Sequence, residues 1–166
     1  MIVLPLRDDD MALVERLSAS RNSIKEANGV PTHKVSDWSD QSIHRLGLMA
    51  EVAIAAWLGV SIDDNTYYGG DAGYDLCAGG LTVDVKMRSR TGLDLVTFAD
   101  MSDFRADIAI LCWPAGERDV ACVGYVSRDR FRLQARRMMI GSNERLVMPW
   151  RELRSIGSGP GPALEE

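Results

Sequence analysis

The sequence has little with which to build a disulfide framework or a zinc site. It contains three cysteines, which are isolated and form no Cys-x-x-Cys pair, and two histidines. A disulfide scaffold needs paired cysteines, and a zinc site needs clustered Cys and His ligands, so neither class is indicated. Isolated cysteines suit a reducing compartment, and we expect a cytoplasmic protein.

The sequence also lacks an excess of positive charge. Its formal net charge is −5, which argues against a protein that coats nucleic acid through bulk electrostatics. Any contact with a polyanion must therefore come from a local group of Lys and Arg side chains.

Long apolar runs are few. The stretch 46–62 is nearly uncharged, but it is about the minimum length of a membrane span, is rich in Ala and Gly, and carries Glu51. We interpret it as a buried helix and expect no membrane association. The first residues hold no basic segment followed by an apolar core, so we expect no signal peptide.

Several common catalytic motifs are missing. The sequence has no His-Glu-x-x-His, no Gly-x-Ser-x-Gly, and no Gly-rich loop that ends in Gly-Lys-Ser/Thr. These absences argue against zinc proteases, serine hydrolases and phosphate-loop nucleotide hydrolases. The remaining candidate chemistry lies in the acidic residues.

What is present fits one α/β domain. With 166 residues, 46% of them hydrophobic and 26% charged, the chain is long enough to bury a substantial core. We expect a mixed central β-sheet flanked by helices. The single domain should span 1–156, with an N-terminal helix and loop over 1–40, followed by a flexible tail over 157–166.

Hydrophobic periodicity and capping residues predict the elements of this domain. Short apolar runs at 106–113 and 120–126 predict buried strands. The expected helices are 9–27, a helix from Ser39 or Asp40 to Leu58, a helix over 128–138 capped by Ser127, and a short one that starts at Pro149 and ends near Ser155.

The most informative segment is a predicted β-hairpin around Gly79-Gly80. Alternating apolar residues flank this pair, and two-residue Gly-Gly loops favour tight turns between antiparallel strands. With this loop Ala78 pairs with Leu81, Cys77 with Thr82, and Leu76 with Val83.

The same register places Asp75 opposite Asp84. Like charges that face each other across a strand pair are destabilising unless something compensates them, and a divalent cation would do so. The period of two puts Lys86 and Arg88 on the face of Asp84. Asp75 on its own fits a turn residue equally well, whereas Asp84 stands in the middle of a strand, where Asp is uncommon.

Glu51 is a further candidate for the same site. It is the only charged residue between Arg45 and Asp63, and its helical neighbours are small or apolar. A lone buried carboxylate is unfavourable. Either this end of the helix touches water, or Glu51 binds a metal ion or a water molecule.

Together, Glu51 in an apolar helix, then Asp75, then Asp84-Val85-Lys86 resemble the signature of the PD-(D/E)XK nuclease superfamily. The further segments 70–76, 106–108 and 123–127 are similar to small phage-type nucleases of that superfamily. The resemblance covers about residues 28–156 and implies a restriction-endonuclease-like core. Tyr74 stands where the proline of the name would be.

The resemblance implies a metal-dependent deoxyribonuclease. Asp75, Asp84 and the backbone carbonyl of Val85 would hold Mg²⁺, for which Mn²⁺ should substitute, and Glu51 would bind it directly or through water. Lys86 would orient the attacking water or help to deprotonate it. If the protein is phage-encoded, it would act in the host cytoplasm.

Binding of DNA requires positive charge near this site. The candidate contacts are Arg88, Arg90, Gln134, Lys34 and His44, of which Gln134 resembles a glutamine that some members place beside the active site. A second group of arginines around 128–137 is equally well explained as a solvated helix face.

Two other functions stay open. The same fold could serve as a non-catalytic DNA-binding or interaction module, in which the carboxylates only cap or pair. It could also be a subunit of a recombination or packaging complex, and homo-oligomers are possible. The sequence does not distinguish endonuclease from exonuclease action.

Overall fold

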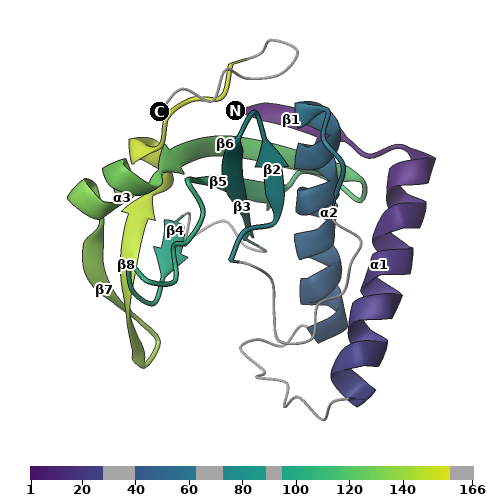
Figure 1. Cartoon of the computed structure of the whole chain (residues 1–166), viewed down its shortest axis with the longest axis horizontal. Helices are drawn as coiled ribbons and strands as arrows, with labels where there is room; N and C mark the ends of the chain where they lie inside the picture. The colour runs from purple at the N-terminus through teal and green to yellow at the C-terminus, as the bar shows by residue number, and fades with distance from the viewer. Residues whose placement is uncertain (28–39, 63–72, 89–94, 158–166) are drawn as a thin grey trace.

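A computed structural model of the chain describes residues 1–27, 40–62, 73–88 and 95–157. These residues form a mixed α/β structure, in which a curled five-stranded sheet has two long helices on one side and a small antiparallel sheet on the other (Figure 1). The helices are α1 (Asp8–Ala27), α2 (Asp40–Leu58) and α3 (Arg128–Gln134), with a 3-10 turn η1 (Trp150–Glu152). The strands are β1 (Ile2–Pro5), β2 (Leu76–Ala78), β3 (Leu81–Met87), β4 (Leu95–Phe98), β5 (Ile108–Pro114), β6 (Asp119–Ser127), β7 (Arg136–Ile140) and β8 (Asn143–Pro149).

The five-stranded sheet has the order β1-β6-β5-β3-β2. Only β3 and β5 run parallel, and the other neighbours are antiparallel. On its inner side β3 pairs with β5 from Val83 to Met87. On its outer side β2 covers it only as far as Val83, so the second half of β3 has no ladder partner on that edge among the described residues.

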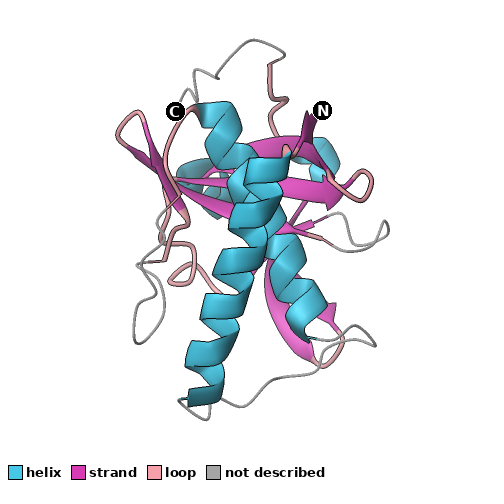
Figure 2. Cartoon of the chain, turned by 90° about the vertical axis from the view of Figure 1, so that its right-hand side faces the viewer, coloured by secondary structure: helices cyan, strands magenta, loops and turns pink. Residues whose placement is uncertain are grey.

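Helix α2 covers one face of this sheet, and α1 packs against α2 (Figure 2). Val83 and Val85 of β3 point to this face and are buried with Leu48 and Ile54 of α2 and Val14 of α1. The periodicity that predicts helices 9–27 and 40–58 is confirmed by α1 and α2. Gly59 follows α2 with φ of +69°, a conformation that suits a helix stop.

The opposite face of the sheet packs against a second core. Ala109 and Leu111 of β5 are buried there with three phenylalanines. Phe98 stacks on Phe104 with a centroid distance of 4.3 Å, and Phe131 of α3 meets both rings edge-on at 5.3 and 5.4 Å. Such aromatic contacts add stability beyond the buried area. They fix the three-stranded sheet, of order β4-β8-β7, beside the carboxyl half of β3.

The predicted hairpin is present, and its register is confirmed for three pairs. Leu76 faces Val83, Cys77 faces Thr82, and Ala78 faces Leu81. Gly79 and Gly80 have φ of +60° and +85°, the positive values that a tight two-residue turn requires at both central positions. The sequence therefore predicts this local structure correctly up to Leu76.

The prediction of a helix over 128–138 is wrong in its second half. Ser127 does cap α3 by accepting a hydrogen bond from the Arg130 amide, but the helix ends at Gln134. Residues 136–140 are extended as β7 and pair with β8. The two strands form a local hairpin, and Gly141, with φ of +62°, lies in the turn between them.

The prediction of buried strands at the apolar runs 106–113 and 120–126 is confirmed by β5 and β6. The helix predicted from Pro149 to near Ser155 is only the short 3-10 turn η1. The small sheet and β1 were not predicted. No helix in the described part of the chain is long and apolar enough to span a membrane.

Asp107 fastens the start of β3 to the start of β5. Its Oδ2 accepts hydrogen bonds from the Thr82 amide at 2.8 Å and from the Thr82 hydroxyl at 2.7 Å. In return the Asp107 amide donates to the Thr82 carbonyl at 3.0 Å. The bonds from Thr82 lower the pKa of the Asp107 carboxyl, so the ionised form supports the fold.

Asp107→Ala should lower the free energy of unfolding at neutral pH by about 1–2 kcal/mol, because Thr82 loses two interactions with a charged acceptor. The difference should shrink as the pH falls through the lowered pKa of Asp107, where the wild-type carboxyl becomes protonated. Urea unfolding of both proteins at several pH values measures this difference in the free energy of unfolding. Asp103→Ala is the control, because Asp103 is exposed. Equal stability of wild type and Asp107→Ala at neutral pH would contradict the assignment.

Candidate metal centre

Asp84 and Lys86 lie on the face of β3 that points away from α2. Their partners across the parallel ladder, Ala109 and Leu111, belong to the phenylalanine core, whereas those of Val83 and Val85 belong to the helix-side core. The predicted alternation along β3 is therefore confirmed. Lys86 Nζ lies 2.8 Å from Asp84 Oδ2 and 5.0 Å from the centroid of the Phe98 ring.

Asp75 lies just before β2, and the prediction that it pairs directly with Asp84 is wrong. The Asp75 amide donates to the Val83 carbonyl at 2.8 Å, although Leu76 already pairs with Val83. Two residues thus face one, as in a β-bulge, and the regular ladder stops. Gly73 allows this sharp approach, since its φ is +89° and a Cβ there would lie 2.5 Å from Arg105 Cδ.

The Asp75 side chain takes the place that the ladder leaves open. Its Oδ2 accepts a hydrogen bond from the Val85 amide at 2.6 Å, at the outer edge of β3. The amide and carbonyl of one strand residue point to the same side, so the Val85 carbonyl also faces this edge. Asp75 is therefore held beside Asp84 by a backbone contact instead of a strand pair.

Glu51 approaches from α2. Glu51 and Asp84 are the only acidic or basic residues that are buried in the described part of the chain, with 9% and 7% of their surface exposed. Arg21 of α1 holds Glu51 through two contacts, Nη2 to Oε2 at 3.1 Å and Nη1 to Oε1 at 3.4 Å. The interpretation of Glu51 as a solvated helix end is wrong, because its neighbours along α2 bury it.

The charges of the neighbouring acids act on Asp75. The pKa of Asp75 is raised from its ordinary value of 3.8 to about 8, first by burial, then by the negative charges of Glu51 and Asp84. The hydrogen bond from Val85 and the charge of Lys86 act in the opposite direction but are weaker. Glu51, Asp84 and Lys86 are therefore near enough to Asp75 to affect its protonation.

The donor set fits a hard divalent cation. Carboxylate oxygens and a backbone carbonyl are the ligands that Mg²⁺ and Mn²⁺ take in proteins, and the surplus negative charge is what such an ion would neutralise. In the described residues no three acidic, His or Cys side chains converge closely enough to hold an ion as they stand. Each carboxylate instead has its own partner: the Val85 amide, Lys86 and Arg21.

Arg88 extends the site at the end of β3. Its Nη2 donates to the Thr97 hydroxyl of β4, and its backbone amide donates to the Cys112 carbonyl at 3.0 Å. Burial lowers the pKa of Arg88, and the nearby positive charge of Arg145 on β8 lowers it further. The positive charge of Arg145 thus adds to that of Arg88, and two neighbouring positive charges favour an anion.

The other predicted DNA contacts are more scattered. Gln134 is exposed at the end of α3, where its amide oxygen accepts a hydrogen bond from Arg130 at 3.0 Å. His44 is half-buried on α2, two turns before Glu51 and on the same side of the helix. Lys34 and Arg90 lie outside the described residues.

Sequence reasoning missed Arg21, Thr97 and Arg145. Arg21 is one of several charges on the amphipathic helix α1, and nothing in its spacing relates it to Glu51, which follows thirty residues later. Thr97 and Arg145 belong to the small sheet that was not predicted. Because a buried carboxylate needs a counter-charge, the burial of Glu51 implies a cationic partner, but the sequence does not indicate which residue it is.

Comparisons of the chain with protein-family models, with curated proteins and with solved structures gave no match. The resemblance to PD-(D/E)XK nucleases therefore stays a prediction based on short motifs. The geometry and the charge of the cluster are what bear on function.

Asp75→Asn should change how stability depends on pH when a chelator is present. Between the Asp75 pKa of 3.8 in the unfolded chain and that of about 8 in the folded protein, the folded protein keeps a proton on Asp75 that the unfolded chain releases. This stabilisation is complete below the unfolded pKa and is lost as the pH rises through about 8. The free energy of unfolding of the wild type should fall over this range, whereas Asn keeps the acceptor for Val85 and has no such loss.

At about pH 9 the variant should be the more stable protein by on the order of 2 kcal/mol, a figure reduced for partial solvent screening. Denaturant titrations of both proteins at a series of pH values measure the difference. Parallel profiles of the two proteins would show that Asp75 is not crowded by Glu51 and Asp84.

Proposed function

We propose that this chain is a divalent-metal-dependent deoxyribonuclease with a restriction-endonuclease-like core, which hydrolyses DNA phosphodiester bonds. The observation that carries the proposal is the placement of Asp75, whose Oδ2 accepts from the Val85 amide at 2.6 Å, next to the ion pair of Asp84 and Lys86, with 2.8 Å between Oδ2 and Nζ. The raised pKa of Asp75, caused first by burial and then by the charges of Glu51 and Asp84, supports it. A fold that served only as a scaffold would gain by replacing one of these acids with a neutral residue. Three acids and a lysine at one strand edge are instead the groups that metal-assisted phosphoryl chemistry uses.

In this proposal Asp75, Asp84 and the Val85 carbonyl hold the ion, and Glu51 binds it directly or through a water molecule. The bound ion supplies a polarised phosphate oxygen and a water of lowered pKa. The burial of Asp84 and Glu51 keeps bulk water from screening these charges. The bulge at Asp75 fixes its carboxyl at the edge of β3, where the Val85 carbonyl also points.

Lys86 positions the water that attacks the phosphate. Its ammonium group contacts Asp84, and the Phe98 ring lies beneath it, so the side chain is directed along the sheet instead of into solvent. Phe98 itself is held by stacking on Phe104. When Asp84 binds the ion, the Lys86 ammonium is left to donate to the water and to the scissile phosphate.

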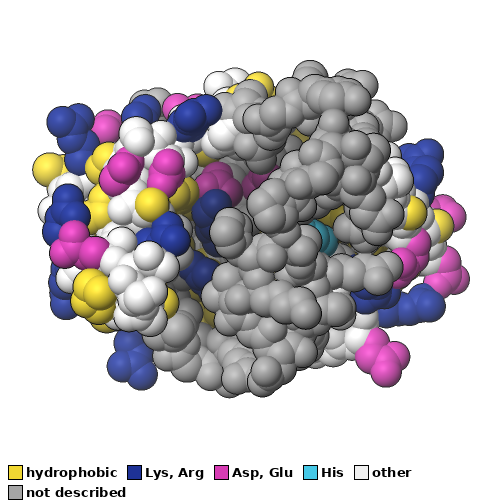
Figure 3. All heavy atoms as spheres, turned by 90° about the horizontal axis from the view of Figure 1, so that it is seen from below, with side chains coloured by type: hydrophobic (Ala, Val, Ile, Leu, Met, Phe, Trp, Pro, Cys, Tyr) yellow, Lys and Arg dark blue, Asp and Glu magenta, His cyan; other side chains and the backbone are white. Residues whose placement is uncertain are grey.

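The cationic end of the molecule supports a polyanionic substrate. Lys and Arg side chains gather, among acidic and apolar ones, on the side that carries α3, β7 and β8 (Figure 3). Several of these arginines are already paired, as Arg136 is with Glu152 and Arg137 with Glu144, each at 2.5 Å. Arg88 lies two residues beyond Lys86 in the chain and is fixed by its bond to the Thr97 hydroxyl, and the charge of Arg145 acts on it, so these two arginines are our candidates for contacts with phosphate.

Asp84→Asn and Lys86→Met should each reduce DNA cleavage roughly 10²-fold or more, because each removes a group that acts at the reacting phosphate. The assay uses linear, circular and single-stranded DNA with Mg²⁺ or Mn²⁺, and Asp103→Asn serves as an exposed control. Absence of cleavage on every substrate, or equal cleavage by the variants, rules out the proposal. DNA binding without cleavage would instead favour the non-catalytic module.

Arg88→Gln and Arg145→Gln should weaken DNA binding uniformly across sequences and should each reduce the slope of log affinity against log salt by about 1. The reason is that each removes one contact with a phosphate. Fluorescence anisotropy at several salt concentrations measures the slopes. Arg118→Gln is the matched control, since Arg118 is exposed and pairs with Asp8 at 2.5 Å. If Arg118→Gln reduced the DNA affinity and the salt slope as much as the other two substitutions, phosphate binding would not be localised at the proposed site.

A further inference from the structure

In the described part of the chain, Arg21 pairs with an acid of the cluster and has no role in the proposed mechanism. It projects from α1 to α2 and contacts both oxygens of Glu51. Its side chain is 40% exposed, whereas that of Glu51 is 12% exposed. The guanidinium group therefore reaches into the site from its rim.

The contact places a positive charge where the divalent cation would bind. A buried carboxylate needs a counter-charge, and in the absence of metal Arg21 supplies it. A planar guanidinium that meets two carboxylate oxygens occupies the directions along which a cation would approach. Arg21 and the ion thus compete for the same acid.

We propose that Arg21 is a positioning residue that holds Glu51 in the metal-free protein and is exchanged for the divalent cation when the site is loaded. The proposal rests on the metal site described above. It assigns to α1 a direct part in metal binding: the α1–α2 ion pair must open for Glu51 to turn to the ion. Arg21 therefore sets the apparent affinity of the site.

A purely structural role of Arg21 has the opposite consequence. If Arg21 only kept Glu51 in place, its removal would disorder a metal ligand and weaken binding of the ion. If Arg21 competes with the ion, its removal strengthens binding. The direction of the change in affinity distinguishes the two roles.

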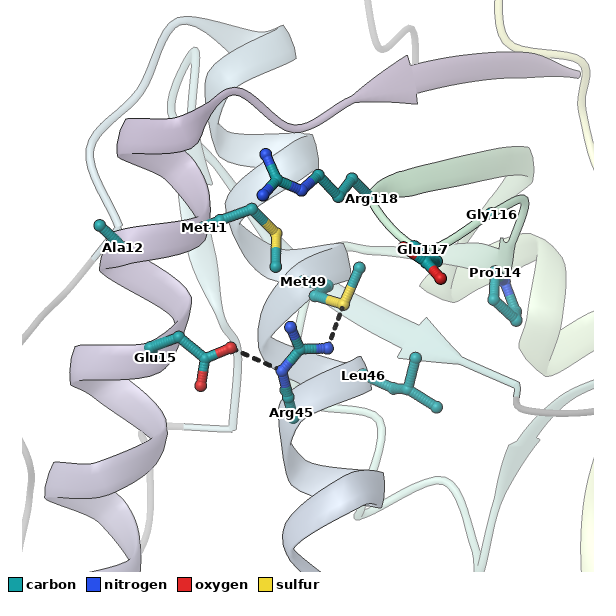
Figure 4. Close-up of a pocket in the computed structure, with 10 residues that line it drawn as sticks. All are labelled: Met11, Ala12, Glu15, Arg45, Leu46, Met49, Pro114, Gly116, Glu117 and Arg118. Atoms are coloured by element: carbon teal, nitrogen blue, oxygen red, sulfur yellow. Dashed lines mark hydrogen bonds and ion pairs between the residues drawn. The ribbon is translucent and has the colours of Figure 1, made fainter.

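The chain offers a matched control in a second α1–α2 ion pair. Arg45 of α2 donates to Glu15 of α1, with 2.7 Å between Nε and Oε1 (Figure 4). Arg45 also contacts Met49, and it projects from a different side of α2 than Glu51, which lies six residues further along. Arg45→Gln removes the same charge and the same kind of helix contact as Arg21→Gln, but away from the acidic cluster.

Titration calorimetry of the full chain with MnCl₂ tests the exchange. Arg21→Gln should bind Mn²⁺ roughly fivefold more tightly than the wild type, the size expected when a partly exposed ion pair no longer has to open. Arg45→Gln should match the wild type. Unchanged or weaker binding by Arg21→Gln, with normal binding by the other two proteins, overturns the exchange but leaves the metal site intact. If the wild type binds no Mn²⁺, the metal site itself fails, and the exchange fails with it.

A second measurement uses the wild type and does not depend on the folding of a variant. In protein with nitrogen-labelled arginine, saturating Mg²⁺ should shift the guanidinium resonances of Arg21, while those of Arg45 stay in place. Unshifted Arg21 resonances, in a protein that calorimetry shows to bind the ion, would overturn the exchange.

Discussion

The negative charges of Glu51, Asp75 and Asp84, which are poorly solvated, are the constraint on which this structure depends. Glu51 and Asp84 are buried, and the pKa of Asp75 is raised to about 8, first by its own burial and then by the negative charges of these two acids. Such a cluster opposes folding unless cations or protons compensate it. The metal-free protein uses both means, since Lys86 and Arg21 supply charge and Asp75 retains a proton. A divalent cation could replace all three at once.

The neighbouring elements fix the position of this edge. Strand β2 is short, so among the described residues no strand pairs with the second half of β3 on its outer side, and the Asp75 side chain bonds to it there. The parallel partner β5 fixes β3 on its inner side, and Asp107 fastens the hairpin to it. Helix α2 brings Glu51 from one face, and Phe98 supports Lys86 from the other. Elements from both layers thus meet at one strand edge.

Local signals predicted the parts of this site that lie close together in sequence. The Gly79-Gly80 turn fixes the register of three residue pairs, and alternation along β3 places Asp84 and Lys86 on one face. The contact of the Asp75 amide with the Val83 carbonyl did not follow from the alternation, because Asp75 lies outside the ladder and next to Gly73, which has a positive φ. The hairpin of β7 and β8, which carries Arg145, did have a local signal in the two-residue loop Gly141-Ser142, but the predicted helix over 128–138 took precedence over it.

The most direct test of a shared cation site is the position of Mn²⁺ in crystals grown with the ion, located by anomalous scattering. The account predicts a single strong peak about 2.1 Å from the carboxylate oxygens of Asp75 and Asp84, with the Val85 carbonyl among its ligands. Glu51 should have turned toward it. Absence of a peak at saturating Mn²⁺, with Asp75 still bonded to the Val85 amide and Glu51 to Arg21, would contradict the account.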